Sequence, residues 1–417
     1  MKNKNSQSKS PKAKSQRQNN FQNFFSKKIM IALLMPILLI AILFAIFAIR
    51  DFLRLDVAFY DIDENSQTAI TTFIKENFSG STRFSVLTDK DAQNPSRVSK
   101  QYDFVFCYHG IFSERVSENA AIFPESFFAL IPSSSRLRCE NKKQIPILLN
   151  HYEVSYLKTI LRDAKISIPE TANAFENFLA FTNGKLFSPI FLAGNDDAIF
   201  LSFIGSLIES ETGSAGYEKF ISLLREHPDF EKMYQTPFAQ KNGNDISLAT
   251  ILAKIGDWKK NGLLLPDWIN VSEYDIEPFM RDQFVGAVFM PLDMHRRISL
   301  RTIANFSDMH FPIRASVSHH AILAPPLMMI KTSRRKNFLS LAQIFLSPDS
   351  QGSLSNMSQL APATLQGTAT DKQADDVRFW AATSPAGPFS GPDKEAFLTR
   401  DVAATFANEV RDYLYHY

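Results

Sequence analysis

The chain has 417 residues, and its 45 Lys and Arg against 43 Asp and Glu give a formal net charge of only +2. Eight of the basic residues and none of the acidic ones lie in residues 1–28, so residues 29–417 carry a net charge of about −6. A protein with that balance has no general affinity for nucleic acid outside its basic tail, and about 365 residues after the next segment suffice for two domains.

The N-terminal tail is rich in Ser, Gln and Asn besides its basic side chains, and this composition predicts disorder. Residues 29–49 follow without a charge, which is typical of a helix that crosses a bilayer. The basic flank predicts a cytoplasmic tail, an uncleaved single-pass anchor in the inner membrane, and residues 50–417 in the periplasm or outside. The alternative is a long cleaved signal peptide, although Ile46, Phe47 and Ile49 do not resemble its cleavage site.

A strand–helix–strand unit is predicted next, from the alternating residues 55–60, the helical run 69–78 and residues 83–87. The polar residues Asp61, Asp63 and Glu64 follow its first strand. In open α/β sheets the carboxyl ends of the strands are where ligands bind, so these side chains are candidates for a ligand site. Capping of the following helix is the alternative role.

Residues 102–108 predict a second buried strand, which ends at Tyr108 and His109. An aromatic face with a polar group beside it can stack on and orient a sugar-like ligand, whereas His109 could equally cap the next turn. Cys107 lies in this strand, and Cys139 is the only other cysteine. A disulfide between them is allowed in an oxidising compartment, and no cysteine or histidine spacing indicates zinc.

Residues 145–181 predict a crossing of the chain between domains. A short strand with a Pro inside it covers residues 145–149. Apolar spacings of three and four then predict a helix over residues 154–161, and a second helix follows a cap at Thr171. Asn150 and Tyr152 lie between the strand and the first helix.

The second half of the chain offers polar candidates after predicted strands. Asn195 and Asp196 follow a strand that begins at Ser188, with capping of the next helix as the alternative role. Another strand is predicted at 283–290, and Asp293 and His295 come directly after it. A strand is also predicted at 306–312, followed by a helix over 331–345. Because Asp293, His295, His319 and His320 lack paired-ligand spacing, we expect neither a metal nor a cofactor.

Five motifs, in their order along the chain, resemble those of the family 1 extracellular solute-binding proteins, the sugar-type receptors of ABC importers. They are the Pro-marked strand at 145–149, Tyr156-x-Lys158, Pro169-x-Thr171 with Phe175, Phe284-x-Gly286-Ala287 with Met290, and the F-L-S-P-x-x-Q segment at 345–351. The chain departs from the family's Gly-x-Trp at 293–295, which removes an aromatic residue that commonly stacks on the ligand. His319 and His320 stand where many members have glycines and another Trp.

The resemblance implies an α/β, two-lobed, type II periplasmic-binding-protein-like fold with a hinge, after one transmembrane helix. Lobe 1 would take approximately residues 55–148 plus 322–365, and lobe 2 residues 149–321 plus 366–417. Chain crossings are expected near residues 147–152 and 318–324. The candidate ligand-binding residues are Asp61, Glu64, Tyr108, His109, Asn150, Tyr152, Asn195, Asp196, Asp293, His295 and His319.

The implied function is delivery of a carbohydrate or polyol to an ABC permease by a membrane-tethered solute-binding protein. In this reading Asn150 bonds ligand hydroxyls and His295 covers a sugar face. The missing Trp and glycines favour an alternative, a structural or protein-interaction module that kept the fold without the ligand. No nucleophile elbow, HExxH motif or phosphate loop indicates an enzyme.

Overall fold

The computed structural model describes residues 35, 36, 38–40, 42, 54–313, 323–334 and 338–417. The predicted tail, most of the predicted anchor and His319 lie outside these residues. Within the described part of the chain, no helix is both long and apolar enough to cross a membrane. Residues 56–417 belong to one unit, to which the following description applies.

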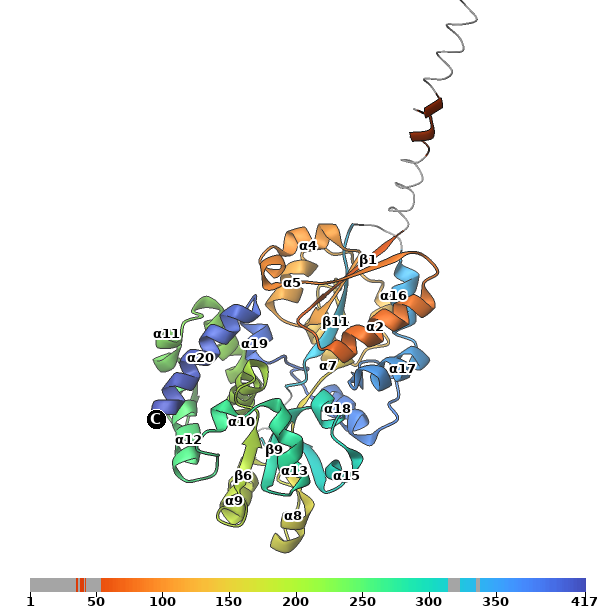
Figure 1. Ribbon diagram of the computed structural model, residues 1–417. Helices are drawn as coiled ribbons and strands as arrows, with labels where there is room; N and C mark the ends of the chain where they lie inside the picture. Colours follow the sequence, from red (N-terminus) through yellow and green to blue (C-terminus); the bar gives the residue numbers. More distant parts are fainter. Residues whose placement is uncertain (1–34, 37, 41, 43–53, 314–322, 335–337) are drawn as a thin grey trace, which may run out of the picture. The chain divides into compact units, whose positions relative to one another are not determined.

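Most strands form two separate sheets (Figure 1). The first has the order β12-β4-β11-β3-β1-β2 and the second has the order β10-β5-β9-β6. The strands of the first sheet are β1 (Leu55–Tyr60), β2 (Thr82–Val86), β3 (Phe104–Tyr108), β4 (Ile145–Leu149), β11 (Pro326–Lys331) and β12 (Ala361–Pro362). Those of the second are β5 (Tyr152–Leu157), β6 (Ser188–Leu192), β9 (Val285–Pro291) and β10 (Phe306–His310).

Burial explains which residues form the central strands. The five residues of β3 are almost continuously apolar because the strand lies between β1, its parallel partner, and the antiparallel β11. In contrast, β2 lies at an edge and its residues are mostly half-buried or exposed. A separate hairpin joins β7 (Pro237–Lys241) to β8 (Asn244–Ser247) through Asn242 and Gly243, both with positive φ, as a two-residue hairpin turn requires.

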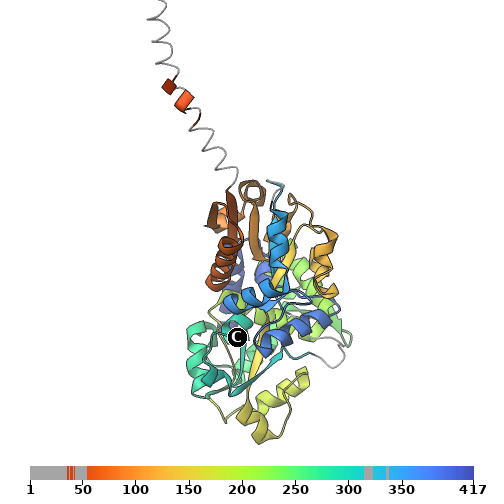
Figure 2. The same ribbon diagram turned by 90° about the vertical axis from the view of Figure 1, so that its right-hand side faces the viewer.

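The helices pack mainly around these sheets. The longer ones are α2 (Glu64–Asn77), α9 (Ala172–Thr182), α10 (Asp197–Glu226), α12 (Leu248–Lys260), α17 (Pro348–Ser358), α18 (Lys372–Thr383) and α20 (Arg400–His416). Shorter ones include α4 (Pro95–Gln101), α5 (Ile111–Ser117), α8 (Lys158–Ala164), α11 (Phe230–Gln235), α13 (Ile276–Arg281), α14 (Leu292–His295), α16 (Leu339–Phe345) and α19 (Pro392–Glu395). Segments far apart in sequence lie side by side, since α2 packs against α16 and α17, and α10 against α19 and α20 (Figures 1 and 2).

Two crossings between the sheets lie beside one another, near the predicted positions. Only Asn150 and His151 separate β4 of the first sheet from β5 of the second. The backbone N–H of Asn150 donates to Pro325 at 3.0 Å, and that of Tyr152 donates to Leu323 at 2.8 Å. Residues 323–325 precede β11 and therefore return the chain to the first sheet. The lobe boundaries themselves stay a prediction.

The F-L-S-P-x-x-Q segment has a structural role in this arrangement. Ser347 caps α17, and Pro348 occupies its first turn. Gln351 is fully buried, and its amide donates to the carbonyls of Ile147 and Phe345, each at 2.8 Å. Its side-chain oxygen accepts from the N–H of Ala363 at 2.9 Å. One glutamine therefore joins β4, the end of α16 and the segment after β12.

The structure corrects two predicted helices and decides whether the two cysteines form a disulfide. Residues 152–157 form β5, and the helix begins only at Lys158, because the strand pairs with both β9 and β10. Apolar spacing alone cannot separate a short buried strand from a helix. The helix predicted from Lys331 is also wrong at its start, since Lys331 ends β11 and α16 begins at Leu339. Cys107 and Cys139 are both free.

Candidate functional site

A cavity of about 260 Å³ lies where the two sheets and their crossings meet. Its walls contain side chains from the first sheet's strand ends, from the crossings, from the start of α10, from the segment around α14, and from α19. The polar and aromatic residues of the walls are Asp63, Tyr108, Asn150, Tyr152, Asp196, Glu273, Asp293, Arg297, Asp393 and Lys394. The cavity thus combines many charged groups with few aromatic ones.

Six residues predicted from the sequence line this cavity together. They are Asp63, Tyr108, Asn150, Tyr152, Asp196 and Asp293. Tyr108 ends β3, whereas Asp293 follows β9, so these residues come from strand ends of both sheets. Asp196 caps α10 by accepting the Ile199 N–H at 2.8 Å. Asp196 therefore has both predicted roles, since it caps the helix and also lines the cavity.

Asn150 and Asp293 are bonded to one another. The Asn150 side-chain amide donates to Asp293 Oδ1 at 2.9 Å, and its oxygen accepts the His151 N–H at 2.9 Å. Arg297 pairs with the other Asp293 oxygen at 3.1 Å. Burial and then the charge of Asp63 raise the pKa of Asp293 to about 6. Asn150 therefore holds this carboxylate in place as well as facing the cavity.

The cavity also contains residues absent from the predicted set. Arg297 lies one helical turn after Asp293, a spacing that could have indicated it. Lys394 pairs with Asp393 at 2.9 Å and with Asp61. Both Lys394 and Asp393 belong to α19, which reaches the cavity because it packs against α10. Nothing in their local sequence marks them for this position.

Three predicted residues near strand ends do not line this cavity. Asp61 lies behind it, where it pairs with Lys394. Glu64 is exposed in the first turn of α2, beside Asp63, which caps that helix. Asn195 has an exposed side chain, and its backbone N–H donates to the carbonyl of Val271.

His295 points away from the cavity and into buried polar surroundings. It contacts Glu153 of β5 and Gln373 of α18. Asp293 lies on the short helix α14, and Arg297 lies two residues beyond its end and pairs with Asp293, so His295 falls on another face. Burial lowers the pKa of His295 to about 4 and raises that of Glu153 above its ordinary value. Both shifts favour the uncharged forms of the two side chains.

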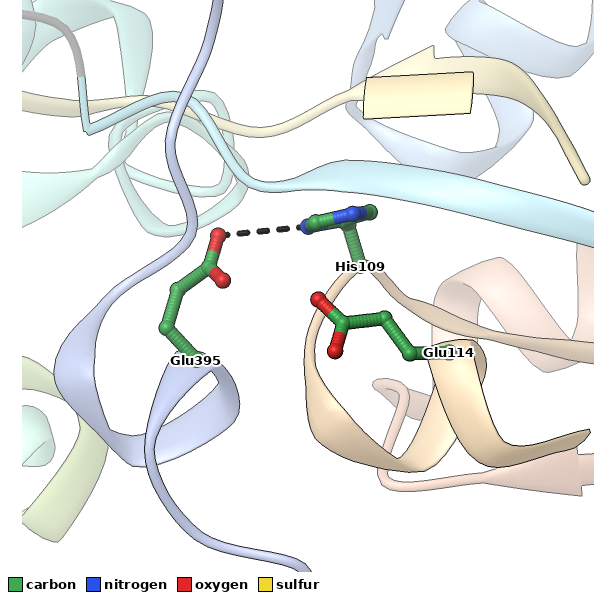
Figure 3. Close-up of side chains that lie close together, drawn as sticks. All are labelled: His109, Glu114 and Glu395. Carbon is green, nitrogen blue, oxygen red and sulfur yellow. Dashed lines mark hydrogen bonds and ion pairs between the residues drawn. The ribbon is translucent and has the colours of Figure 1, made fainter. Parts of the chain in front are cut away.

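His109 belongs to a different cluster, beside a second cavity of about 260 Å³. Its Nδ1 lies 3.2 Å from Glu395 Oε1, and Glu114 is close to both (Figure 3). Arg225 bonds both oxygens of Glu114 at 3.0 Å and one oxygen of Glu395 at 3.1 Å. Against the effect of burial, His109, Arg138 and Arg225 lower the pKa of Glu395 to about 2. Arg225 of α10 thus joins Glu114 of α5 and Glu395 of α19 through ion pairs.

No protein family matches this chain, and no curated protein matches it. Solved structures do match. The bacterial solute receptor AcbH aligns with a TM-score of 0.65 and 11% identity, over 86% of this chain and 96% of that chain. RafE of Streptococcus pneumoniae, solved with raffinose, aligns with a TM-score of 0.61 and 12% identity, over 87% and 99%.

A sugar transporter of Bacillus licheniformis, solved with stachyose, aligns with a TM-score of 0.58 and 11% identity, over 87% of this chain and 98% of that chain. The chain has the fold of a solute-binding protein. At these identities the likeness concerns the fold alone. In this solute-binding-protein fold, the cavity described above is where strand ends of both sheets meet the crossings.

Proposed function

We propose that this protein is an extracytoplasmic solute-binding protein that binds a small carbohydrate-like molecule and delivers it to an ABC permease. The observation that carries the proposal is the cavity of about 260 Å³, which draws its walls from both sheets and from the crossings between them. Proteins of the same fold supply the ligand class, since raffinose and stachyose are bound in two of them and β-D-galactopyranose is preferred by AcbH.

In this proposal the two sheets are the cores of two lobes, with approximately the boundaries predicted from the sequence. Tyr108 belongs to the first lobe, Asp196 and Asp293 belong to the second, and Asn150 lies at a crossing. A solute that contacts all four has its full set of contacts only when the lobes approach one another. Binding therefore shifts the equilibrium towards the closed arrangement, because the solute has higher affinity for it.

The cavity's side chains are suited to binding a solute without transforming it. Burial and the negative charges of Asp63 and Asp293 raise the pKa of Tyr108 well above its ordinary value, so its hydroxyl stays protonated at neutral pH. Burial likewise keeps Tyr152 protonated. Two neutral hydroxyls, an amide and several carboxylates can accept from and donate to the hydroxyl groups of a sugar.

A thermal-shift screen of the full chain in detergent against sugars, oligosaccharides and polyols tests the proposal. A solute at a hundred times its dissociation constant should stabilise the protein by about 2.7 kcal/mol, because only the folded state binds it. Tyr108→Phe should reduce the stabilisation by about 1 kcal/mol through loss of one hydrogen bond. The matched control Tyr415→Phe, whose ring is exposed outside the cavity, should leave it unchanged.

Equal responses of the two tyrosine variants to a bound solute would place the binding site elsewhere. If no member of the screen stabilises the protein, the chain is better described as an interaction module that lost its solute. The screen therefore separates the two functions that the sequence leaves open.

We also propose that residues 29–49 anchor the protein in the inner membrane with residues 50–417 outside. The support is the uncharged run and the eight basic residues before it. Protease added to spheroplasts should digest the large portion and spare the tail, which a tag on residue 1 reports. Protection of residues 50–417 in intact spheroplasts, with digestion after lysis, would contradict this topology.

A further inference from the structure

The charges of the cavity do not balance. Five carboxylates line it, from Asp63, Asp196, Glu273, Asp293 and Asp393, against the two cations Arg297 and Lys394. Both cations are already engaged. Arg297 pairs with Asp293 at 3.1 Å and lies 3.9 Å from Glu273. Lys394 is shared between Asp393 and Asp61, which lies behind the wall.

Asp63 and Asp196 have no basic partner among the described residues. Each uses one oxygen to cap a helix, with Asp63 accepting from Ser66 N–H and Asp196 from Ile199 N–H, both at 2.8 Å. The second oxygen of Asp63, Oδ2, is buried and has no hydrogen-bond partner in the described structure. The positive ends of the two helices offset only roughly half a charge each. Of the two negative charges on Asp63 and Asp196, about one therefore stays uncompensated.

The neighbouring groups respond to this excess. Burial and the charge of Asp63 raise the pKa of Asp293, although Asn150 and Arg297 oppose the rise. Burial, Asp61 and Asp196 raise the pKa of Asp393 in spite of Lys394. Sugar hydroxyls can bond these carboxylates but cannot neutralise them. A ligand with its own positive charge can do both.

Resting on the proposed function, we infer that the solute of this cavity is a sugar or polyol that carries a basic amino group. Its ammonium group would lie between Asp63 and Asp196, where it would supply the missing charge. Its hydroxyls would be left to Tyr108, Tyr152 and Asn150. The small number of aromatic side chains in the walls agrees with recognition by charge and hydrogen bonds more than by stacking.

The test compares sugars that differ only in the group at C2 of each ring. The probes are the glucosamine disaccharide of chitosan, N,N′-diacetylchitobiose and cellobiose, which carry an ammonium, an acetamide and a hydroxyl at the same position. The monosaccharides glucosamine, galactosamine and mannosamine are measured beside their neutral parents. We expect at least one amine-bearing probe to bind about tenfold tighter than its neutral counterparts in calorimetry at low salt, with the preference reduced at high salt.

Two variants test whether Asp63 and Asp196 cause the preference for the amine. Asp63→Asn and Asp196→Asn keep the helix caps, because Asn caps a helix as well as Asp does, and each removes one charge. Each should lower the affinity for the amine about tenfold more than it lowers the affinity for the neutral parent. Asp229→Asn is the matched control, since Asp229 caps α11 outside the cavity.

The outcomes separate this inference from the proposed function. If neutral sugars bind as tightly as their amines, or if the Asp63 and Asp196 variants keep the amine preference, the inference is wrong and the solute-binding function stands. If no amine-bearing probe binds, the inference is also wrong. Only a blank result for the amine-bearing probes and for the wider screen of neutral sugars and polyols together counts against the solute-binding function itself.

Discussion

Gly110→Ala is expected to lower the free energy of unfolding by about 3 kcal/mol or more, through a collision that no side-chain rotation can relieve. Gly110 lies between β3 and α5 with φ of +152°, a conformation that L-residues rarely adopt. A Cβ at this position would lie 2.1 Å from the carbonyl oxygen of Lys394. The backbone of α19 would have to move away, and Lys394 and Asp393 would leave the cavity wall with it.

Chemical denaturation measures the stability, and the thermal-shift screen on the same variant measures the loss of solute binding. Gly184→Ala is the matched control, because Gly184 also has a positive φ, of +74°, but an added Cβ would meet no atom within 4 Å. It should cost only about 1–2 kcal/mol from the backbone conformation. Equal losses for the two variants would show that the approach of Lys394 to Gly110 contributes nothing.

Asp293→Asn is expected to gain stability relative to the unaltered protein as the pH rises. The folded-state pKa of Asp293 is about 6, above its ordinary value of 3.8, so the folded protein retains this proton longer than the unfolded chain does. The stability of the unaltered protein therefore falls by about 3 kcal/mol as the pH rises from about 4 to 6, and stays lowered above 6. An amide cannot ionise, so the variant escapes this loss.

The measurement is the difference in unfolding free energy between the variant and the unaltered protein from pH 4 to pH 8. Taking the difference removes the titrations of Glu153, His295 and other groups that both proteins share. Asp229→Asn, as a control, should show almost no change over this range, because hydrogen bonds and Lys232 lower the pKa of that exposed carboxylate and its titration lies almost entirely below pH 4. A difference that does not vary with pH would contradict the raised pKa of Asp293.

Local sequence patterns predicted the elements whose surroundings are uniform along their length. The strands β3, β6 and β9 are short apolar runs buried on both faces, and their sequence shows it. Residues 154–157 were assigned to a helix because Val154 and Leu157 also fit helical spacing. The pairing with β9 and β10 decides the structure, and it depends on residues more than 130 positions away. The β7–β8 hairpin was missed although Asn242-Gly243 is a strong turn signal.

In the candidate site, too, the sequence predicted some residues and could not predict others. Tyr108, Asp196 and Asp293 follow strands, and the rule that ligands bind at strand ends located them. The rule could not give the phase of the short helix α14, which turns Asp293 into the cavity and His295 away from it. It could not find Lys394 either, because α19 reaches the cavity through packing on α10, nearly 200 residues earlier in the sequence.

The contacts of Lys394 limit which residues of the cavity can change during evolution. It lines the cavity, pairs with Asp61 and Asp393, and passes its backbone against Gly110. A substitution there would change the solute contacts and the packing between β3 and α19 together. Glu273, on another part of the wall, is held more loosely, by an ion pair of 3.9 Å to Arg297. Descendants that acquire a new solute are therefore expected to vary first on that part of the wall, while Gly110 and Lys394 stay as they are.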